Sequence, residues 1–276
     1  MIPSTEKCLG QSPQGTAMLA VPTGGHITNA GRQGSNPVPG PRAETPADSL
    51  AVAGLQPFSS VDFPGRLAAV VFLQGCPWRC GYCHNPGLQP RGRGAGPRWP
   101  ALRDWLTRRL GRLDGVVFSG GEPSLDPALP DALDELRSMG YAVGLHTAGL
   151  APRRLAALLP RLDWVGLDIK AAPGDAALHD RITGRRGSVR AVRESLALLQ
   201  AGDVGFECRS TVHPAWFTDT DLLHLVRELA AVPRHVLQLA RLPDEAGALH
   251  APIAWPSPAL LAEARAIRPD LLLRAT

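Results

Sequence analysis

Long apolar runs are missing from the sequence, although 44% of its residues are hydrophobic. A membrane-spanning helix needs roughly 18 or more consecutive apolar residues, so we expect no membrane partner. Residues 1–30 also lack a basic segment followed by an unbroken apolar one, which favours the cytoplasm over export. The 29 basic residues are interleaved with 25 acidic ones, so the net charge of +4 predicts no nucleic-acid partner.

Lysine and cysteine are both scarce, and the few that occur are informative. Lys7 and Lys170 are the only lysines among the 29 cationic residues. Lys170 therefore stands out as a position where arginine is not expected to serve. Five cysteines in a chain without an export signal argue against a disulfide framework and favour thiolate chemistry.

Residues 1–47 contain few large apolar side chains and are rich in Gly, Pro, Ser, Thr and Gln. Such a segment cannot bury enough surface to offset the entropy lost on ordering, so we predict a disordered N-terminal extension. Cys8 in it is expected to have no role. A mis-assigned start codon is the alternative, because Met18 lies inside the segment. Residues 48–276 are predicted to form one folded domain.

From Leu50 onward, short β-rich apolar runs alternate with helical patterns, which is typical of βα units and a parallel sheet. The predicted strands are residues 67–73, 115–118, 142–146, 164–168, 204–212 and 235–240, with a short seventh at 271–274. The predicted helices are residues 99–110, 127–139, 152–159, 189–200, 219–231 and 258–267. We therefore expect the α/β class, in the form of a partial (βα)6 TIM-like barrel.

The segment GCPWRCGYCHNPG carries Cys76, Cys80 and Cys83 directly after the first predicted strand. Three thiolates on one tight loop can bind three corners of a cubane iron-sulfur cluster and leave the fourth iron open to a ligand. The alternative is a structural zinc site, which normally needs four ligands, often as two separated pairs. The sequence offers no second pair, and His84 is badly placed as a fourth ligand because it directly follows Cys83. The pattern therefore favours the iron-sulfur cluster.

The CxxxCxxC spacing after a first strand resembles that of radical S-adenosylmethionine (SAM) enzymes, from about Leu50 to the end of the chain. The resemblance implies a barrel of the radical SAM type, a four-iron four-sulfur cluster, and reductive cleavage of SAM to a 5'-deoxyadenosyl radical. The opening GLQPFSSVDFPGRLAAVVFLQGCPWRCGYCHNPGL is similar to that of activating proteins of anaerobic ribonucleoside-triphosphate reductase. By this resemblance, Tyr82 and His84 lie against the SAM adenine and the cluster.

Gly120, Gly121 and Glu122 stand in FSGGEPSLDP, directly after the second predicted strand. A glycine pair lets backbone carbonyls approach a ligand's ammonium group, and the Glu122 carboxylate adds a negative charge. Taken alone, the segment reads as an ordinary turn. Its place in the chain resembles the family's GGE motif, which implies contact with the SAM amino group.

Asp168 and Lys170 end the apolar strand WVGLDIK and project to one side, because they are two residues apart. An ion pair at the surface is the alternative. The scarcity of lysine and the family's matching DLK or DIK segment favour contact with SAM instead. Lys170 is also a candidate catalytic residue.

Polar side chains alternate along VGFECRSTVHP, where Glu207, Arg209, Thr211 and His213 share one face of the predicted strand. Four polar groups that point into a plain core are costly, so this face is expected to line an active site. A buried Glu207–Arg209 pair is the alternative. The resemblance implies that Arg209 contacts SAM, and His213 is a second candidate catalytic residue. Cys208, on the other face, is expected to be buried and not a ligand.

Further candidates are Thr147, Thr183, Gly184 and Arg241. Many relatives carry Asn between the Thr and Gly of the HTAG segment, where this chain has Ala148, so no side-chain amide contact is expected there. Most of these motifs fall at the carboxyl ends of successive predicted strands. Active sites of βα barrels assemble at that end.

The motifs and the resemblance together imply a radical SAM activating enzyme that generates a glycyl radical on a partner enzyme. Anaerobic ribonucleoside-triphosphate reductase is the expected partner, and pyruvate formate-lyase is the alternative one. A non-catalytic iron-sulfur or zinc-binding scaffold is the alternative of a different class. Residues 85–119 contain no further cysteine, so we expect one cluster and an external flavodoxin or ferredoxin as electron donor.

Overall fold

The structure is a computed structural model that describes residues 44–243, 249–252 and 254–275. Its centre is an eight-stranded sheet in the order β1-β2-β3-β4-β5-β6-β7-β10, beside a small β8-β9 sheet. The strands are β1 (Val52–Ser59), β2 (Ala68–Leu73), β3 (Gly115–Gly120), β4 (Ala142–Thr147), β5 (Trp164–Asp168), β6 (Gly205–Val212), β7 (His235–Leu239), β8 (Leu242–Pro243), β9 (Leu249–His250) and β10 (Leu272–Ala275). The helices are α1 (Trp99–Thr107), α2 (Leu129–Ser138), α3 (Pro152–Leu158), α4 (Ala176–Thr183), α5 (Ser188–Ala201), α6 (Asp219–Glu228) and α7 (Pro258–Ile267).

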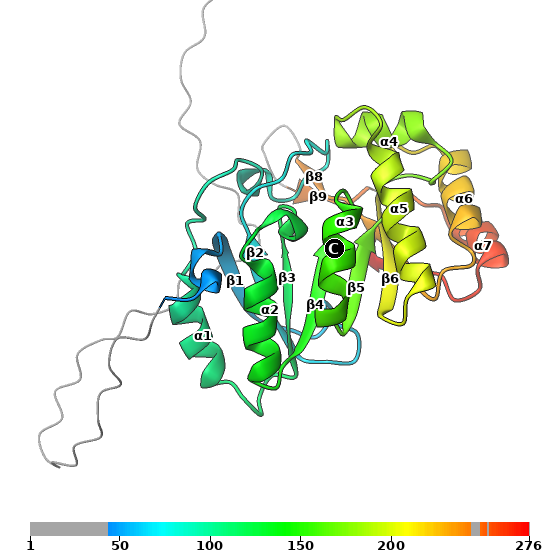
Figure 1. Cartoon of the computed structure of the whole chain (residues 1–276). Coiled ribbons are helices and arrows are strands. Elements are labelled where there is room, and N and C mark those ends of the chain that lie inside the picture. Colours follow the sequence, from blue (N-terminus) through cyan, green and yellow to red (C-terminus); the bar gives the residue numbers. More distant parts are fainter. Residues whose placement is uncertain (1–43, 244–248, 253, 276) are drawn as a thin grey trace, which may run out of the picture.

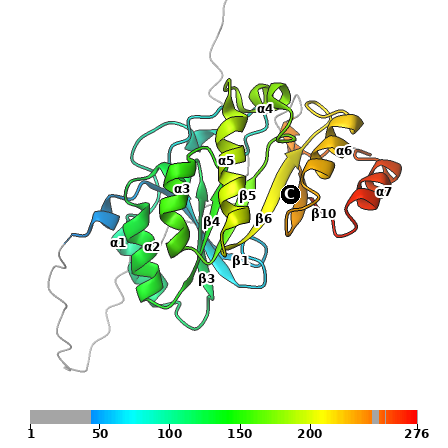
Figure 2. The same ribbon diagram turned by 45° about the vertical axis from the view of Figure 1, so that its right-hand side comes forward.

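Strands β2 to β7 and β10 run parallel, which confirms the six predicted strands and the short seventh. β1 pairs antiparallel with β2 at one edge, and β10 forms the other edge beside β7. Within the described residues the two edge strands do not pair with each other, so the barrel is partial. Figures 1 and 2 show α1, α2, α3 and α5 side by side along one face of the sheet. No helix in the described part of the chain is long and apolar enough to cross a membrane.

Three strands and one helix were not predicted from the sequence: β1, β8, β9 and α4. Gly54 and Pro57 interrupt the pattern of β1, and proline is tolerated there because the strand lies at a sheet edge. Asp175 is the N-cap of α4, and its carboxylate accepts a hydrogen bond from the Leu178 amide at 2.9 Å. Its buried face includes the polar residues His179 and Thr183, so it lacks the apolar periodicity of an amphipathic helix.

The inside of the barrel is apolar at the end where the parallel strands begin. The Phe63 and Trp164 rings stack there with centroids 5.6 Å apart, against Val70 and Val117. Gly115 and Gly144 leave room for the Phe63 ring, since a Cβ at either position would lie within 3.4 Å of it. This packing closes one end of the barrel, and the polar groups gather at the other end.

The predicted N-terminal extension, residues 1–47, overlaps the folded domain. Residues 1–43 lie outside the described part of the chain, so their predicted disorder stays a prediction. Ala47 is fully buried, and the Thr45 hydroxyl donates a hydrogen bond of 2.8 Å to the Glu135 carboxylate on α2. The last residues of the predicted extension therefore belong to the fold.

Candidate active site

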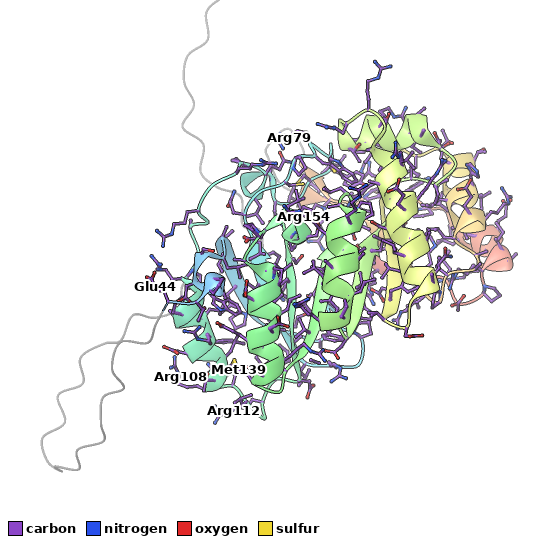
Figure 3. All side chains as sticks on the ribbon, in the orientation of Figure 1. Glu44, Arg79, Arg108, Arg112, Met139 and Arg154 are labelled. Atoms are coloured by element: carbon purple, nitrogen blue, oxygen red, sulfur yellow. The ribbon has the colours of Figure 1, made fainter. Side chains whose placement is uncertain are left out.

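The cysteine loop follows β2 at the end of the molecule where the parallel strands finish. Arg79, which lies within this loop, is at the upper end of the molecule in Figure 3, whereas Arg108 and Arg112 lie at the opposite end. A cavity of about 220 Å³ opens between the loop and the strand ends. The predicted site residues that line this cavity are Cys76, Tyr82, Cys80, Cys83, His84, Gly120, Gly121, Thr147, Asp168, Lys170 and Arg209.

The three cysteines of the loop are half-buried, and burial raises the pKa of the Cys76 thiol to about 11. Burial also raises the pKa of Cys80, although nearby Lys170 opposes this shift. Metal binding at such thiols must displace a proton. Among the described residues, no three Cys, His, Asp or Glu side chains converge to hold one metal ion. Three thiols spread along a cavity wall suit a cubane cluster, in which each thiolate binds its own iron.

Gly120 and Gly121 pack directly against the cysteine loop. Gly120 has a φ of +116°, and a Cβ there would collide with the backbone of Leu73. A Cβ on Gly121 would collide with the carbonyl of Gly75. The Gly121 amide donates to the Leu73 carbonyl at 2.9 Å, so this pair is tied to the chain that leads into the loop. Only glycine permits this close approach.

Glu122 is 2% exposed and does not line the cavity. Its carboxylate accepts hydrogen bonds from the Ser124 amide and hydroxyl, from the Thr147 hydroxyl at 2.7 Å, and from the Ala148 amide at 2.9 Å. Burial raises its pKa, although these hydrogen bonds oppose the shift. Glu122 therefore joins the loop after β3 to the loop after β4, instead of facing the cavity as predicted.

Asp168 stands between two cations at the cavity wall. One of its carboxylate oxygens lies 2.9 Å from the Lys170 ammonium, and the other lies 3.7 Å from Nε of Arg209. Burial opposes ionisation of Asp168, but the two cations hold its pKa below the usual range. Gly166 leaves space for the Arg209 guanidinium, which lies 5.6 Å from the centre of the Trp164 ring. The three charged groups predicted on β5 and β6 are thus adjacent.

Tyr82 is 5% exposed, and its ring meets the Trp216 ring edge to face at 5.4 Å. Its buried hydroxyl has no hydrogen-bond partner among the described residues. A buried hydroxyl at a cavity wall normally finds a partner, so this group suits a ligand with a polar atom. Nearby, His84 accepts a long hydrogen bond of 3.4 Å from the Arg241 amide.

Only some of the polar side chains predicted on one face of β6 reach the cavity. Arg209 and Thr211 line the cavity, but Glu207 does not. Glu207 is 1% exposed, and one of its carboxylate oxygens lies 3.2 Å from Nε of Arg234. The other carboxylate oxygen lies 3.9 Å from Nε of Arg209, which is the buried Glu207–Arg209 pair named as the alternative from the sequence. Cys208 is fully buried, as predicted, and burial raises its pKa to about 12.

His213 does not line the cavity. Its ring nitrogen Nδ1 accepts a hydrogen bond of 3.0 Å from the Ala215 amide, and the ring packs against Trp216. β6 ends at Val212, so the side-chain alternation that was extended to His213 stops one residue too early. The structure therefore gives no support to His213 as a catalytic residue.

Several polar residues of the cavity were not predicted. They are Asn85, Gln89, Ser119, His146 and Gln238, whereas Thr211 lines the cavity as expected for the polar face of its strand. His146 contacts the Asp62 carbonyl at 2.9 Å and the Ser119 hydroxyl at 3.3 Å. Burial and nearby Arg209 lower its pKa to about 4, so this ring is neutral at physiological pH. Ser119, His146 and Gln238 stand near the ends of β3, β4 and β7, and Asn85 and Gln89 follow Cys83 in the cysteine loop, so their place in the chain was the available signal.

An open partial barrel with three cysteines after its first parallel strand is the arrangement of a radical SAM enzyme. Residues 70–229 match the family described as the Radical SAM superfamily, and the chain belongs to that family. Its cofactors are therefore a four-iron four-sulfur cluster and SAM. Membership identifies an enzyme and argues against a non-catalytic scaffold.

Two relatives are named pyruvate formate-lyase-activating enzymes, and one solved structure shares the fold. The pyruvate formate-lyase-activating enzyme of Clostridium pasteurianum is 32% identical over 190 residues, which cover 67% of this chain and 76% of that enzyme. The enzyme of the same name from Streptococcus mutans is 34% identical over 156 residues, covering 48% of this chain and 54% of its own length. The crystal structure of SuiB from Streptococcus suis shares the fold, with a TM-score of 0.56 at 14% identity, covering 74% of this chain and 47% of SuiB.

Proposed function

We propose that Cys76, Cys80 and Cys83 hold the cluster and that the cavity beside them holds SAM. The donor set consists of three thiols on one loop, which leaves one iron of a cubane without a protein ligand. When bound, the cluster supplies the single electron that splits SAM into methionine and a 5'-deoxyadenosyl radical. The chain itself binds and orients SAM.

The proposed SAM contacts follow from charge. SAM carries a carboxylate, an ammonium group and a sulfonium. Lys170 and Arg209 give the cavity wall two cations, of which Asp168 neutralises one, so a net positive charge remains for the carboxylate. The backbone at Gly120 and Gly121 is open to the ammonium group. Tyr82 and His84 remain the proposed neighbours of the adenine, and Thr147 and Glu122 act by holding the strand ends together.

We infer that the enzyme activates a glycyl radical enzyme. The observation that carries this proposal is the 32% identity to a pyruvate formate-lyase-activating enzyme over 76% of that enzyme's length. In the proposed reaction, a hydrogen atom leaves the α-carbon of a partner glycine and joins the 5'-deoxyadenosyl radical. The products are 5'-deoxyadenosine and a glycyl radical stored on the partner.

The remaining lining of the cavity supports a peptide as substrate. Asn85, Gln89, Ser119, Thr211 and Gln238 are uncharged side chains that both donate and accept hydrogen bonds. His146 is neutral as well, and the charged side chains Lys170, Arg209 and Asp168 are already assigned to SAM. The rest of the lining therefore offers no charge for an ionic substrate. An uncharged peptide main chain around a glycine matches these groups.

Two partners are candidates, and one experiment separates them. The opening segment is similar to activators of anaerobic ribonucleoside-triphosphate reductase, whereas the two relatives from Clostridium pasteurianum and Streptococcus mutans favour pyruvate formate-lyase. The reconstituted enzyme is incubated anaerobically with SAM, a reductant and either purified candidate from the same source. The partner should show the glycyl radical signal by electron paramagnetic resonance (EPR). Formation of 5'-deoxyadenosine without a radical on either candidate would contradict both assignments.

The electron is proposed to come from an external flavodoxin or ferredoxin. Within the described residues, Cys208 is the one cysteine outside the loop, and it is fully buried. A second cluster would need about four further cysteines. The surface beside the cysteine loop carries the exposed side chains of Arg79, Arg181, Arg185 and Arg186. Such a surface attracts an acidic redox protein.

A further inference from the structure

The cysteine loop is bound to the last turn of α4, roughly a hundred residues later in the chain. The Arg79 amide donates a hydrogen bond of 2.9 Å to the Thr183 carbonyl, and the Gly81 amide donates one of 3.1 Å to the Ile182 carbonyl. Carbonyls in the last turn of a helix lack partners within the helix. The loop supplies those partners, and its two donors lie on either side of Cys80.

Side chains hold the same part of the loop from two directions. The Trp78 ring meets the fully buried His179 ring of α4 edge to face, with centroids 5.6 Å apart. On the other side, a Cβ on Gly81 would collide with the Trp216 ring. Arg181 of α4 also donates a hydrogen bond to the Trp216 carbonyl at 2.5 Å. The segment that carries Cys80 is therefore enclosed between α4 and Trp216.

The end of α4 is itself fixed by two hydrogen-bonded groups. The Thr183 hydroxyl donates to the His179 carbonyl at 2.9 Å, and the Asp180 carboxylate accepts hydrogen bonds from the Ser188 amide and hydroxyl at 3.0 and 2.9 Å. The hydrogen bonds of Asp180 connect α4 to Ser188, the first residue of α5. Neither Thr183 nor Gly184 lines the cavity, so their predicted candidacy as site residues needs another explanation.

We propose that the last turn of α4, ending in Gly184, is a positioning element that sets the place of Cys80 in the cluster site. Gly184 caps the helix in the left-handed conformation, with φ of +66° and ψ of +20°. A Cβ there would lie 3.3 Å from the carbonyl oxygen of Arg79 and 3.4 Å from its Cβ. Contacts that tight require the loop to shift by a few tenths of an ångström. The proposal rests on the proposed cluster site.

The chain offers a matched control in the same turn. Gly187 has φ of +70° and ψ of +16°, almost the same conformation as Gly184, but a Cβ on it would meet nothing within 4 Å. Alanine is strained in this conformation at either position. The variants Gly184→Ala and Gly187→Ala therefore share the backbone strain, and only Gly184→Ala pushes on the cysteine loop.

The test compares both variants with the wild type after anaerobic reconstitution. Both should lower the melting temperature by a similar amount, roughly 2–8 °C. Gly184→Ala alone should change the EPR spectrum of the reduced cluster and slow SAM cleavage about 10-fold. If Gly184→Ala fails to fold, Gly184→Asn and Gly187→Asn replace the pair, because asparagine tolerates this conformation.

The possible outcomes separate this inference from the proposed function. If both variants keep the wild-type EPR spectrum and the wild-type cleavage rate, the positioning role of α4 is overturned. Equal changes in both variants would overturn it as well, because they would trace to backbone strain alone. A wild-type protein that takes up no cluster would overturn the proposed cofactor site, and the inference with it.

Discussion

The Lys170 ammonium lies 2.9 Å from an Asp168 carboxylate oxygen and 5.9 Å from the centre of the Tyr82 ring. Burial alone would lower the pKa of Lys170, but the Asp168 carboxylate and the Tyr82 and Cys80 groups raise it above its usual value. The lysine is therefore charged throughout the physiological range, and it is 8% exposed. A compact cation is enclosed between a carboxylate and an aromatic ring.

Replacing this lysine by arginine should impair SAM binding. Lys170→Arg keeps the charge, but a planar guanidinium does not fit the space of an ammonium group. We expect about 10-fold weaker SAM binding, as for the loss of one hydrogen bond to a charged group, with cluster content near the wild-type value. The measurements are SAM affinity and 5'-deoxyadenosine formation in the reconstituted protein. The control is Arg190→Lys, whose side chain is 87% exposed on α5. Unchanged affinity and cleavage in Lys170→Arg would remove Lys170 from the SAM site.

Cysteine variants should define a single cluster with about four irons per chain. Cys76→Ala, Cys80→Ala and Cys83→Ala should each abolish cluster-dependent SAM cleavage, because each removes one iron ligand. Cys208→Ala is the control and should keep the cluster, since Cys208 is buried in the core. Iron and sulfide analysis with an assay of 5'-deoxyadenosine checks this. About eight irons per chain, or loss of the cluster in Cys208→Ala, would contradict it.

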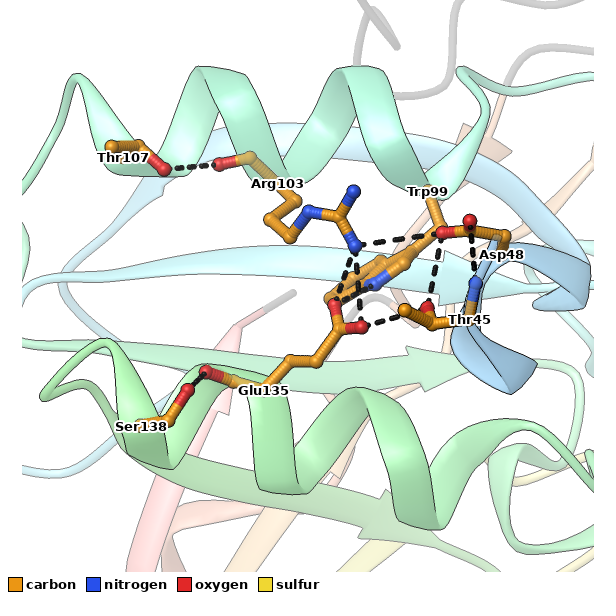
Figure 4. Close-up of polar contacts among 7 residues, drawn as sticks. All are labelled: Thr45, Asp48, Trp99, Arg103, Thr107, Glu135 and Ser138. Carbon is orange, nitrogen blue, oxygen red and sulfur yellow. Dashed lines mark hydrogen bonds and ion pairs between the residues drawn. The ribbon is translucent and has the colours of Figure 1, made fainter. Parts of the chain in front are cut away.

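Glu135 joins the first described residues to α1 and α2, as Figure 4 shows. Its carboxylate accepts hydrogen bonds of 2.8 Å from Thr45, 2.8 Å from Trp99 and 2.9 Å from Arg103. Glu135→Gln removes the charge opposite a buried arginine and should lower the free energy of unfolding by about 1–3 kcal/mol.

The matched control for this change is Glu194→Gln. Glu194 forms an exposed pair with Arg190 on α5, so its loss should cost no more than about 0.5 kcal/mol. Denaturant unfolding of the protein measures both values. Similar effects in the two variants would show that the network around Glu135 contributes no more than a surface ion pair.

His235 should make the fold sensitive to acid. Burial, with Arg268 nearby, lowers its pKa to about 3, from 6.5 in the unfolded chain. Between pH 6.5 and 4.5 the unfolded chain therefore binds a proton at this residue that the folded chain does not. The resulting loss of stability is about 1.4 kcal/mol for each unit that the pH falls. His235→Gln removes this titrating group. The difference in unfolding free energy between wild type and variant should therefore change by about 1.4 kcal/mol for each pH unit between pH 6.5 and 4.5. Parallel pH profiles would contradict the assignment.

The arginines beside the cysteine loop should matter for a protein donor but not for a chemical one. The double variant Arg185→Glu/Arg186→Glu should slow flavodoxin-driven SAM cleavage about 10-fold at low salt. With dithionite its rate should match the wild type. Arg108→Glu/Arg112→Glu is the control, because these exposed residues lie at the opposite end of the molecule (Figure 3). An equal loss with both reductants would indicate damage to the site and not to donor docking.

The sequence allowed prediction of features that depend on local patterns. β3, β4 and β5 are buried on both faces and therefore read as apolar runs, such as Val116 to Phe118. Asp168 ends one of those runs and Arg209 lies on the neighbouring strand β6, so both were expected at the same end of the barrel. Contacts between distant loops were not predictable, because no local pattern records them. The binding of Glu122 to the loop after β4 is one example.

The contact between the cysteine loop and α4 also orders the events of synthesis. The three thiols leave the ribosome well before Ile182 and Thr183, whose carbonyls hold the loop. At about 5–20 residues per second, on the order of ten seconds pass between these events. During that interval the loop lacks its docking partner and its thiols are accessible to oxidants. The docked form of the cysteine loop can therefore exist only after Ile182 and Thr183 have been made.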